Sequence, residues 1–128
     1  MNKIVLDASA ILAIIKGEPG AEKLSPQLLA NATASTVNLA EVQTKLVNSG
    51  WSPAQAWEDA TSPIREIISF DSKQARIAGN LASDTKHLGL SLGDRACLAL
   101  GLALDAPVYT TERIWKQLKL DVGVHVIR

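Results

Sequence analysis

The sequence contains little that would mark a secreted, membrane-spanning or strongly basic protein. It has a single cysteine, Cys97, among 128 residues, so no disulfide can form within the chain. No apolar run approaches the roughly 20 residues that a membrane helix requires, and the first residues do not have the pattern of a signal peptide, so we expect none. Lysine plus arginine and aspartate plus glutamate each number 13, so the formal net charge is zero. We therefore expect a cytoplasmic protein with no membrane partner, in which local charge would bind any nucleic acid.

Apolar residues, in contrast, are plentiful. They make up 47% of the chain and charged residues make up 20%, which excludes disordered and low-complexity classes because a full core can be buried. The length is that of one ordinary domain and is too short for two. We expect residues 1–128 to form a single domain.

Short aliphatic or β-branched runs alternate with longer segments of helical period. This alternation is typical of a parallel sheet covered by helices, so the predicted fold class is α/β. Gly-Pro-rich turns and Ser-Pro or Asp caps separate the segments. The expected strands are residues 3–6, 32–36, 64–70, 107–110 and 124–127, the last at an edge of the sheet. The expected helices are residues 10–16, 21–30, 38–49, 53–62, 72–82, 93–104 and 112–118.

Four carboxylates stand at or near the starts of helices in this pattern. They are Asp7, Glu41, Asp94 and Glu112. In a parallel sheet the carboxyl ends of the strands and the starts of the following helices share one edge, where ligands bind. We therefore expect these side chains to converge, although the sequence scatters them.

Each acid also has an ordinary structural interpretation. Asp7 can be a helix N-cap, Asn38 with Glu41 and Ser91 with Asp94 have the spacing of capping boxes, and Glu112 can complement a helix dipole. The apolar neighbours of Glu41 and Asp94 favour a further role, because unpaired carboxylates there would suffer desolvation and mutual repulsion. Mg²⁺ or Mn²⁺ would resolve that conflict, since hard divalent ions prefer oxygen ligands.

Several blocks, taken in order, resemble the PIN-domain ribonucleases, specifically the VapC-type toxins. The blocks span most of the chain, and their order is more specific than any one of them. They are residues 4–13 (IVLDASAILA), 17–22 (GEPGAE), 38–42 (NLAEV), 90–99 (LSLGDRACLA) and 108–115 (VYTTERIW). The resemblance implies a three-layer sandwich with a central parallel sheet, Mg²⁺- or Mn²⁺-dependent cleavage of RNA, a homodimer, and inhibition by a cognate antitoxin protein.

The resemblance also implies roles for individual residues. Asp7, Glu41 and Asp94 match the family's core acids, which serve as catalytic and metal-binding residues. Glu112 matches the fourth, where the family commonly has the shorter aspartate, and this difference leaves a second metal ion open. Polar residues beside these acids are expected to support them, namely Ser9, Thr36 and Thr110.

An acidic pocket repels RNA, so cations must surround it. The candidates are Arg95, Arg113, Lys16, Lys86 and Lys116, although isolated surface lysines and arginines are common in any protein. We expect a cation-activated water to attack phosphorus in line, with no nucleophilic side chain. Cys97 lies between apolar neighbours and is expected to be a small core residue.

Other functions fit the sequence less well. A receiver domain would have an acidic pair after its first strand, and a haloacid-dehalogenase-like phosphatase would have a second aspartate where this chain has Ser9. The remaining alternative is a PIN-like module that binds RNA or protein without cleavage, because Glu112 has weakened the metal site.

Overall fold

The computed structural model describes residues 2–128, and its five strands form one parallel sheet in the order β3-β2-β1-β4-β5. This arrangement confirms the predicted α/β class and the edge position of the last strand. The strands are β1 (Ile4–Leu6), β2 (Ala32–Ser35), β3 (Glu66–Ile68), β4 (Val108–Thr110) and β5 (Val124–Val126).

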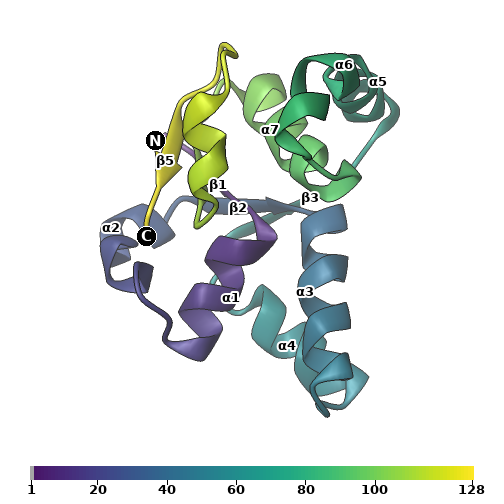
Figure 1. Ribbon diagram of the computed structural model, residues 1–128. Coiled ribbons are helices and arrows are strands. Elements are labelled where there is room, and N and C mark those ends of the chain that lie inside the picture. The colour runs from purple at the N-terminus through teal and green to yellow at the C-terminus, as the bar shows by residue number, and fades with distance from the viewer. Residues whose placement is uncertain (1) are drawn as a thin grey trace.

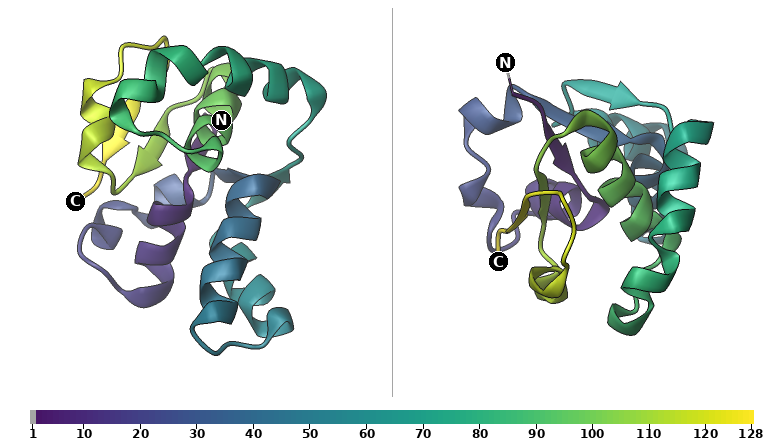
Figure 2. Two further views of the ribbon diagram at one scale, coloured as in Figure 1. Left: turned by 45° about the vertical axis from the view of Figure 1, so that its right-hand side comes forward. Right: turned by 90° about the horizontal axis from the view of Figure 1, so that it is seen from above.

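Helices cover both faces of the sheet, as the three-layer prediction requires. In the view of Figure 1, α1, α3 and α4 lie below the sheet and α5, α6 and α7 lie above it, and Figure 2 shows the same layers from two other sides. The α-helices are α1 (Ala8–Lys16), α2 (Pro26–Leu29), α3 (Thr36–Asn48), α4 (Pro53–Thr61), α5 (Ser72–Asn80), α6 (Ala82–Thr85) and α7 (Leu92–Leu104). The 3-10 helices are η1 (Ala21–Lys23), η2 (Lys86–Leu88) and η3 (Arg113–Gln117).

The pleat of β1 divides the interior into two cores. Ile4 and Leu6 pack with residues of α1, α3 and α4, whereas Val5 packs with residues of α7 and β4. Successive side chains of a strand point to opposite faces, so this one strand contributes to both cores. The apolar helix α7 is buried as expected, and Cys97 lies fully buried within it.

Close approach of α7 to β4 depends on a glycine. A Cβ built at Gly101 would lie 2.6 Å from a methyl carbon of Val108 and 2.9 Å from one of Val122. Any larger residue would push the helix off the sheet, because both partners are themselves packed in the core. The position of α7 relative to the sheet matters for the site, since the first turn of this helix carries Asp94.

Several element boundaries differ from the prediction. Residues 21–30 form η1 and α2 rather than one helix, because Ser25 caps a new helix that has Pro26 in its first turn. The helix expected at 72–82 ends at Asn80, and α6 follows it. The segment expected as helix 112–118 is the 3-10 helix η3. Helix α7 begins at Leu92, one residue before its expected start.

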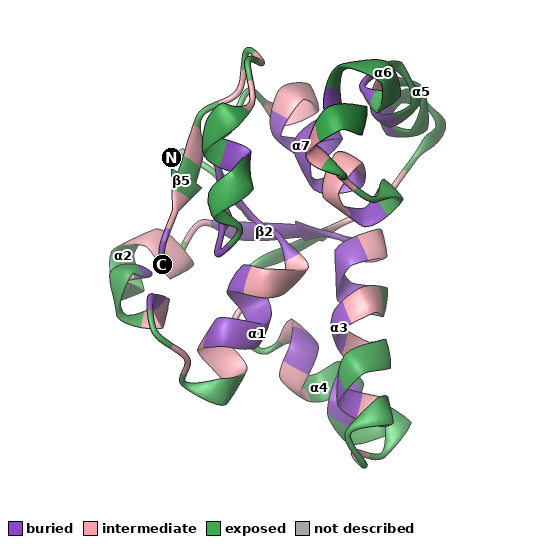
Figure 3. Cartoon of the chain, viewed as in Figure 1, coloured by how far each residue is buried: buried purple, intermediate pink, exposed green. Residues whose placement is uncertain are grey.

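One side of α3 is buried and the other is exposed. Leu39, Val42 and Leu46 are buried, whereas Ala40, Thr44 and Asn48 are exposed, so buried and exposed colours alternate along this helix in Figure 3. No helix among residues 2–128 is both long and apolar enough to cross a membrane.

Candidate functional site

The carboxyl ends of β1, β2 and β4 meet at one edge of the sheet, where ligands bind in folds of this kind. Helices α1 and α3 begin directly after β1 and β2, and a hydrogen bond between Asn38 of α3 and Gly93 of α7 holds the start of α7 beside them. A cavity of about 160 Å³ opens at this edge. All four predicted acids line it, namely Asp7, Glu41, Asp94 and Glu112.

Asp7 is the most deeply buried of these acids, with 3% of its surface exposed. Its Oδ1 accepts hydrogen bonds from the Ala10 amide at 2.8 Å and the Ser9 hydroxyl at 2.7 Å, and its Oδ2 accepts one from the Thr110 hydroxyl at 2.6 Å. Burial raises the pKa of Asp7 from 3.8 to about 6; the three hydrogen bonds lower it in part, and the charge of Asp94 raises it. Asp7 is therefore an N-cap of α1 whose ionised form is disfavoured.

Two hydroxyls connect Asp7 to the end of β4. The Ser9 hydroxyl accepts a hydrogen bond from the Thr111 amide at 2.9 Å, and the Thr110 hydroxyl accepts one from the Glu112 amide at 3.0 Å. The two hydroxyl oxygens are 3.3 Å apart. Ser9 and Thr110, both predicted as supporting residues, thus hold the Asp7 carboxylate in one orientation.

The start of α3 differs from the prediction and removes one supporting residue from the cavity. The helix begins at Thr36 with Ser35 as its N-cap, so Asn38 is an internal residue and does not form the predicted capping box. Thr36 does not line the cavity. Its hydroxyl accepts a hydrogen bond from the Phe70 amide at 3.1 Å and joins α3 to the segment after β3. The missed signal is Ser35, an N-cap residue type directly after the apolar strand.

Glu41 is half-buried and is held from two sides. The amide nitrogen of Asn38 donates to Glu41 Oε1 at 2.9 Å and to the Gly93 carbonyl at 3.0 Å. A Cβ at Gly93 would collide with the Glu41 carboxylate. Glu41 therefore lies over the first turn of α7, in space that only a glycine leaves free.

Asp94 and Glu112 occupy the outer part of the cavity. Asp94 forms the predicted capping box of α7: its Oδ2 accepts from the Ser91 amide at 2.9 Å, and the Ser91 hydroxyl accepts from the Asp94 amide at 3.2 Å. Glu112 is exposed and precedes η3 without a side-chain capping bond. Both side chains therefore have freer access to solvent than Asp7 has.

The charges of three of these acids act on the buried thiol of Cys97. Burial raises the pKa of Cys97 well above its ordinary value, and the charges of Asp7, Asp94 and Glu41 raise it further. This thiol therefore lies within the combined field of three carboxylates. The ion pairs of residues 2–128 join Lys3 to Glu66 and Arg128 to Glu18, outside this cavity.

The chemistry of these donors suits a hard divalent cation. Carboxylates line the cavity together with Asn38, whose buried Oδ1 has no hydrogen-bond partner among the described residues. Across residues 2–128, however, no three His, Cys, Asp or Glu side chains are already grouped as a ligand set. Glu41 and Asp94 are instead hydrogen-bonded to residues of their own helix ends. Mg²⁺ commonly uses one or two carboxylates and several waters, so the donors fit such an ion without three preassembled ligands.

The predicted cations do not gather at this cavity. The Arg95 guanidinium donates to the Ala78 carbonyl at 2.9 Å and braces α7 against α5, and the Arg113 side chain donates to the Arg128 carbonyl at 3.2 Å. Three predicted lysines are exposed and do not line the cavity, namely Lys16, Lys86 and Lys116.

Lys45, which sequence reasoning missed, is the one basic side chain of residues 2–128 that lines the acidic cavity. It lies four residues after Glu41 on α3, and residues at this spacing share one face of a helix. That spacing is the signal that could have identified it. The cavity thus combines four acids with one flexible cation.

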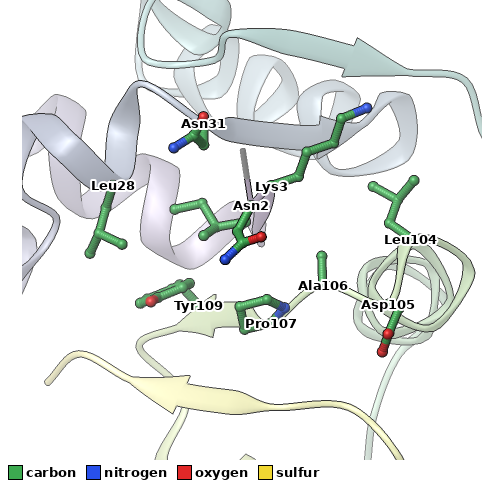
Figure 4. A pocket seen from close by; sticks show the side chains of 10 residues that line it. Asn2, Lys3, Leu28, Asn31, Leu104, Asp105, Ala106, Pro107 and Tyr109 are labelled. Carbon is green, nitrogen blue, oxygen red and sulfur yellow. The ribbon is translucent and has the colours of Figure 1, made fainter.

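A larger cavity lies elsewhere. It has a volume of about 820 Å³ and lies at the amino ends of the strands, between α2 and the α7–β4 connection (Figure 4). Its lining includes Lys3, Leu28, Asp105 and Tyr109, and none of the four predicted acids. Volume alone therefore does not locate the chemically distinctive site.

Fold and site together define a class: a parallel α/β domain that gathers acids at the carboxyl edge of its sheet. A family model described as the PIN domain matches residues 4–120. The chain belongs to the PIN domain family. Among curated proteins, no sequence matches it significantly.

Solved structures resemble the whole chain at low sequence identity. A chain of the Rickettsia felis VapBC2 complex, bound to a promoter DNA fragment, has a TM-score of 0.72 and 22% identity, covering 94% of this chain and 96% of that one. A chain of DNA-bound VapBC from Salmonella typhimurium has a TM-score of 0.76 and 16% identity, with 97% of each chain covered. Mycobacterium tuberculosis VapC20, described as a sarcin-ricin loop cleaving toxin, has a TM-score of 0.72 and 16% identity, covering 94% and 99%. These similarities establish a common fold.

Proposed function

We propose that this protein is a metal-dependent endoribonuclease, and that Asp7, Glu41, Asp94 and Glu112 form its active site. The observation that carries the proposal is that four acids from separate segments line one cavity together with Lys45. The cofactor is Mg²⁺ or Mn²⁺. When bound, such an ion neutralises charge on a phosphodiester and lowers the pKa of a coordinated water, which then becomes an effective nucleophile.

Each residue that lines the cavity has its own role in this proposal. Asp7 is held by three hydrogen bonds and provides the most rigid ligand for the cation. Glu41 and Asp94, both half-buried, complete the acidic wall and orient the attacking water. Glu112 is exposed at the solvent edge and would help to hold a second divalent ion. The Lys45 ammonium attracts the negatively charged phosphate of the RNA to a cavity that is otherwise acidic.

The biological setting we propose is that of a VapBC-type toxin–antitoxin pair. The structural relatives include VapBC complexes from two bacteria and a toxin described as cleaving the sarcin-ricin loop. We propose a cognate antitoxin protein and a second copy of this chain as partners, and RNA in the cytoplasm as the substrate.

Metal-dependent cleavage is the direct test. The purified protein is expected to cut labelled RNA with Mn²⁺ or Mg²⁺ at least about 100-fold faster than with EDTA, because the cation supplies several kcal/mol of charge stabilisation. Cleavage ends should carry 5′-phosphate and 3′-hydroxyl groups, identified by ligation and sequencing. Asp94→Asn should lower the rate to the EDTA level, and Asp121→Asn, at an exposed acid outside the cavity, should not.

One alternative has an observation in its favour. Because no three acids among residues 2–128 are grouped as a ligand set, a PIN-like module that binds RNA or protein without cleavage is the second candidate. Tight RNA binding with no cleavage under either metal, unchanged by Asp94→Asn, would support this module and contradict the nuclease.

Lys45→Ala is expected to affect RNA binding more strongly than the rate at which bound RNA is cleaved. Loss of one phosphate contact should raise KM roughly 10-fold at low salt and reduce the slope of log affinity against log salt by about one unit. The measurement is steady-state cleavage over a salt series. Lys119→Ala is the matched control, because Lys119 lines a separate cavity with Asp84 and His87. Equal effects of the two substitutions would remove Lys45 from the site.

A further inference from the structure

Asn38 is a buried amide within the acidic cavity. Its side chain is 1% exposed and lies in the first turn of α3. Both amide hydrogens have partners, since the nitrogen donates to Glu41 Oε1 at 2.9 Å and to the Gly93 carbonyl at 3.0 Å. One side chain therefore joins a predicted active-site acid to the first turn of α7, which lies 55 residues further along the chain.

The oxygen of the same amide has no hydrogen-bond partner among residues 2–128. Buried polar atoms are nearly always paired, and an unpaired one indicates a ligand or an ordered water at that point. Asn38 is one of the residues that line the acidic cavity, so this unpaired acceptor belongs to a residue of the site. An acceptor next to carboxylates suits a donor such as a water of hydration of a cation.

Gly93 leaves the space that the Glu41 carboxylate occupies. A Cβ at residue 93 would overlap both carboxylate oxygens and the carboxyl carbon of Glu41. The Glu41 carboxylate thus lies against both the α-carbon of Gly93 and the side-chain amide of Asn38.

We propose that Asn38 is a positioning residue, which fixes Glu41 over the first turn of α7 and whose free Oδ1 accepts a hydrogen bond from a water coordinated to the divalent cation. This inference rests on the proposed function, because it requires a cation in the acidic cavity. A leucine at position 38 would fill a similar volume without donating to Glu41 or Gly93. An alanine at position 93 would displace Glu41 without altering Asn38.

Mn²⁺ affinity of the RNA-free protein provides the test. Electron paramagnetic resonance of free Mn²⁺ gives the Kd for wild type, Asn38→Leu, Gly93→Ala and the double variant. Each single substitution should weaken Mn²⁺ binding about 10- to 100-fold, the range found for residues that orient metal ligands. The Mn²⁺ Kd of the double variant should be close to that of the single variant with the higher Kd, because both substitutions act on Glu41 and such effects are not additive. Strict additivity would contradict a shared target.

Gln74→Leu is the matched control. Gln74 is also a buried amide with an unpartnered oxygen, and it donates from Nε2 to the Ser69 carbonyl at 3.1 Å, but it lies on α5 and does not line the cavity. Its substitution should change the melting temperature and leave the Mn²⁺ Kd unchanged. An equal loss of Mn²⁺ affinity in Gln74→Leu and Asn38→Leu would overturn the proposal, as general destabilisation would then explain both.

The outcomes also separate this inference from the proposed function. If wild type binds no Mn²⁺, the proposed function fails. If wild type binds Mn²⁺ and Asn38→Leu binds it equally well while melting lower in EDTA, Asn38 is merely structural and only the inference fails. Should Asn38→Leu not fold, Asn38→Ala and Gly93→Ala provide the same comparison.

Discussion

Replacing Asp7 with asparagine is expected to abolish RNA cleavage and to stabilise the metal-free protein. The loss of activity should reach about 10³-fold, because a lost cation ligand removes roughly 4 kcal/mol of transition-state stabilisation. The gain in stability has a different cause, which is the raised pKa of the Asp7 carboxyl.

The sign of the stability effect follows from proton binding. The pKa of Asp7 rises from 3.8 in its ordinary state to about 6 in the fold, so between these values the folded protein binds more protons than the unfolded chain. Its contribution to stability therefore falls as the pH increases from about 4 to about 6, and above that range the ionised carboxylate costs about 3 kcal/mol. Asparagine carries no such charge.

The hydrogen bonds around residue 7 should survive the change. An asparagine oxygen can accept from Ser9 and Ala10 as Asp7 Oδ1 does, and its nitrogen can donate to the Thr110 hydroxyl. Urea unfolding of metal-free Asp7→Asn at about pH 7.5 should therefore show a gain of roughly 1–3 kcal/mol over wild type, shrinking toward pH 4.

Asp7→Ala provides the contrast. It removes the charge but also the cap, leaving the Ser9, Ala10 and Thr110 donors unpaired, so it should be less stable than Asp7→Asn by about 1–3 kcal/mol. Equal stability of wild type and Asp7→Asn at neutral pH would show that the buried charge carries no cost. Full cleavage activity of Asp7→Asn would remove this residue from the active site.

Saturating Mn²⁺ or Mg²⁺ is expected to raise the melting temperature of the wild-type protein by roughly 10 °C. A cation at about 100 times its Kd stabilises the folded state by about 2.7 kcal/mol, because it binds the assembled acids and not the unfolded chain. The acids then gain a counter-charge that the ion pairs of residues 2–128 do not supply at this cavity.

The shift should depend on pH in a defined direction. Below the Asp7 pKa of about 6 the carboxyl is protonated and must release its proton to bind a cation, so the shift should be small near pH 5 and full near pH 8. Differential scanning fluorimetry with matched NaCl controls measures it. Asp7→Asn should lose most of the shift, and Asp121→Asn should retain it. An identical small shift at both pH values and in both variants would indicate only general ionic strength effects.

Local rules account for what sequence reasoning predicted correctly near the site. The apolar run of β1 followed by Asp7, and the spacing of Ser91 and Asp94, are signals that act within four residues, and both N-terminal caps form as expected. Cys97 was placed in the core because its neighbours are apolar, and it is buried. The same local rules predict Asn38 as the N-cap of α3, which is wrong. Ser35, another residue type that favours the N-cap position, lies three residues earlier and caps the helix.

The roles of the cations illustrate what local rules could not predict. Arg95, a candidate RNA-binding residue, directly follows Asp94 in the sequence, and its guanidinium donates a hydrogen bond to the Ala78 carbonyl of α5. Lys45 was overlooked, although it lines the cavity. Neighbours in sequence on a helix point in different directions, about 100° apart, so adjacency to an acid says little about sharing its cavity.

The sequence by itself determined the α/β class, the order of its elements and the acids at the ends of strands, because periodicity and capping are properties of short segments. Only the tertiary structure decided which side chains meet. The contact of Asn38 with Gly93, and the position of Glu41 against both, depend on how α3 and α7 pack across the edge of the sheet. Packing of that kind is set by the shapes of two whole cores, which no pattern within one segment contains.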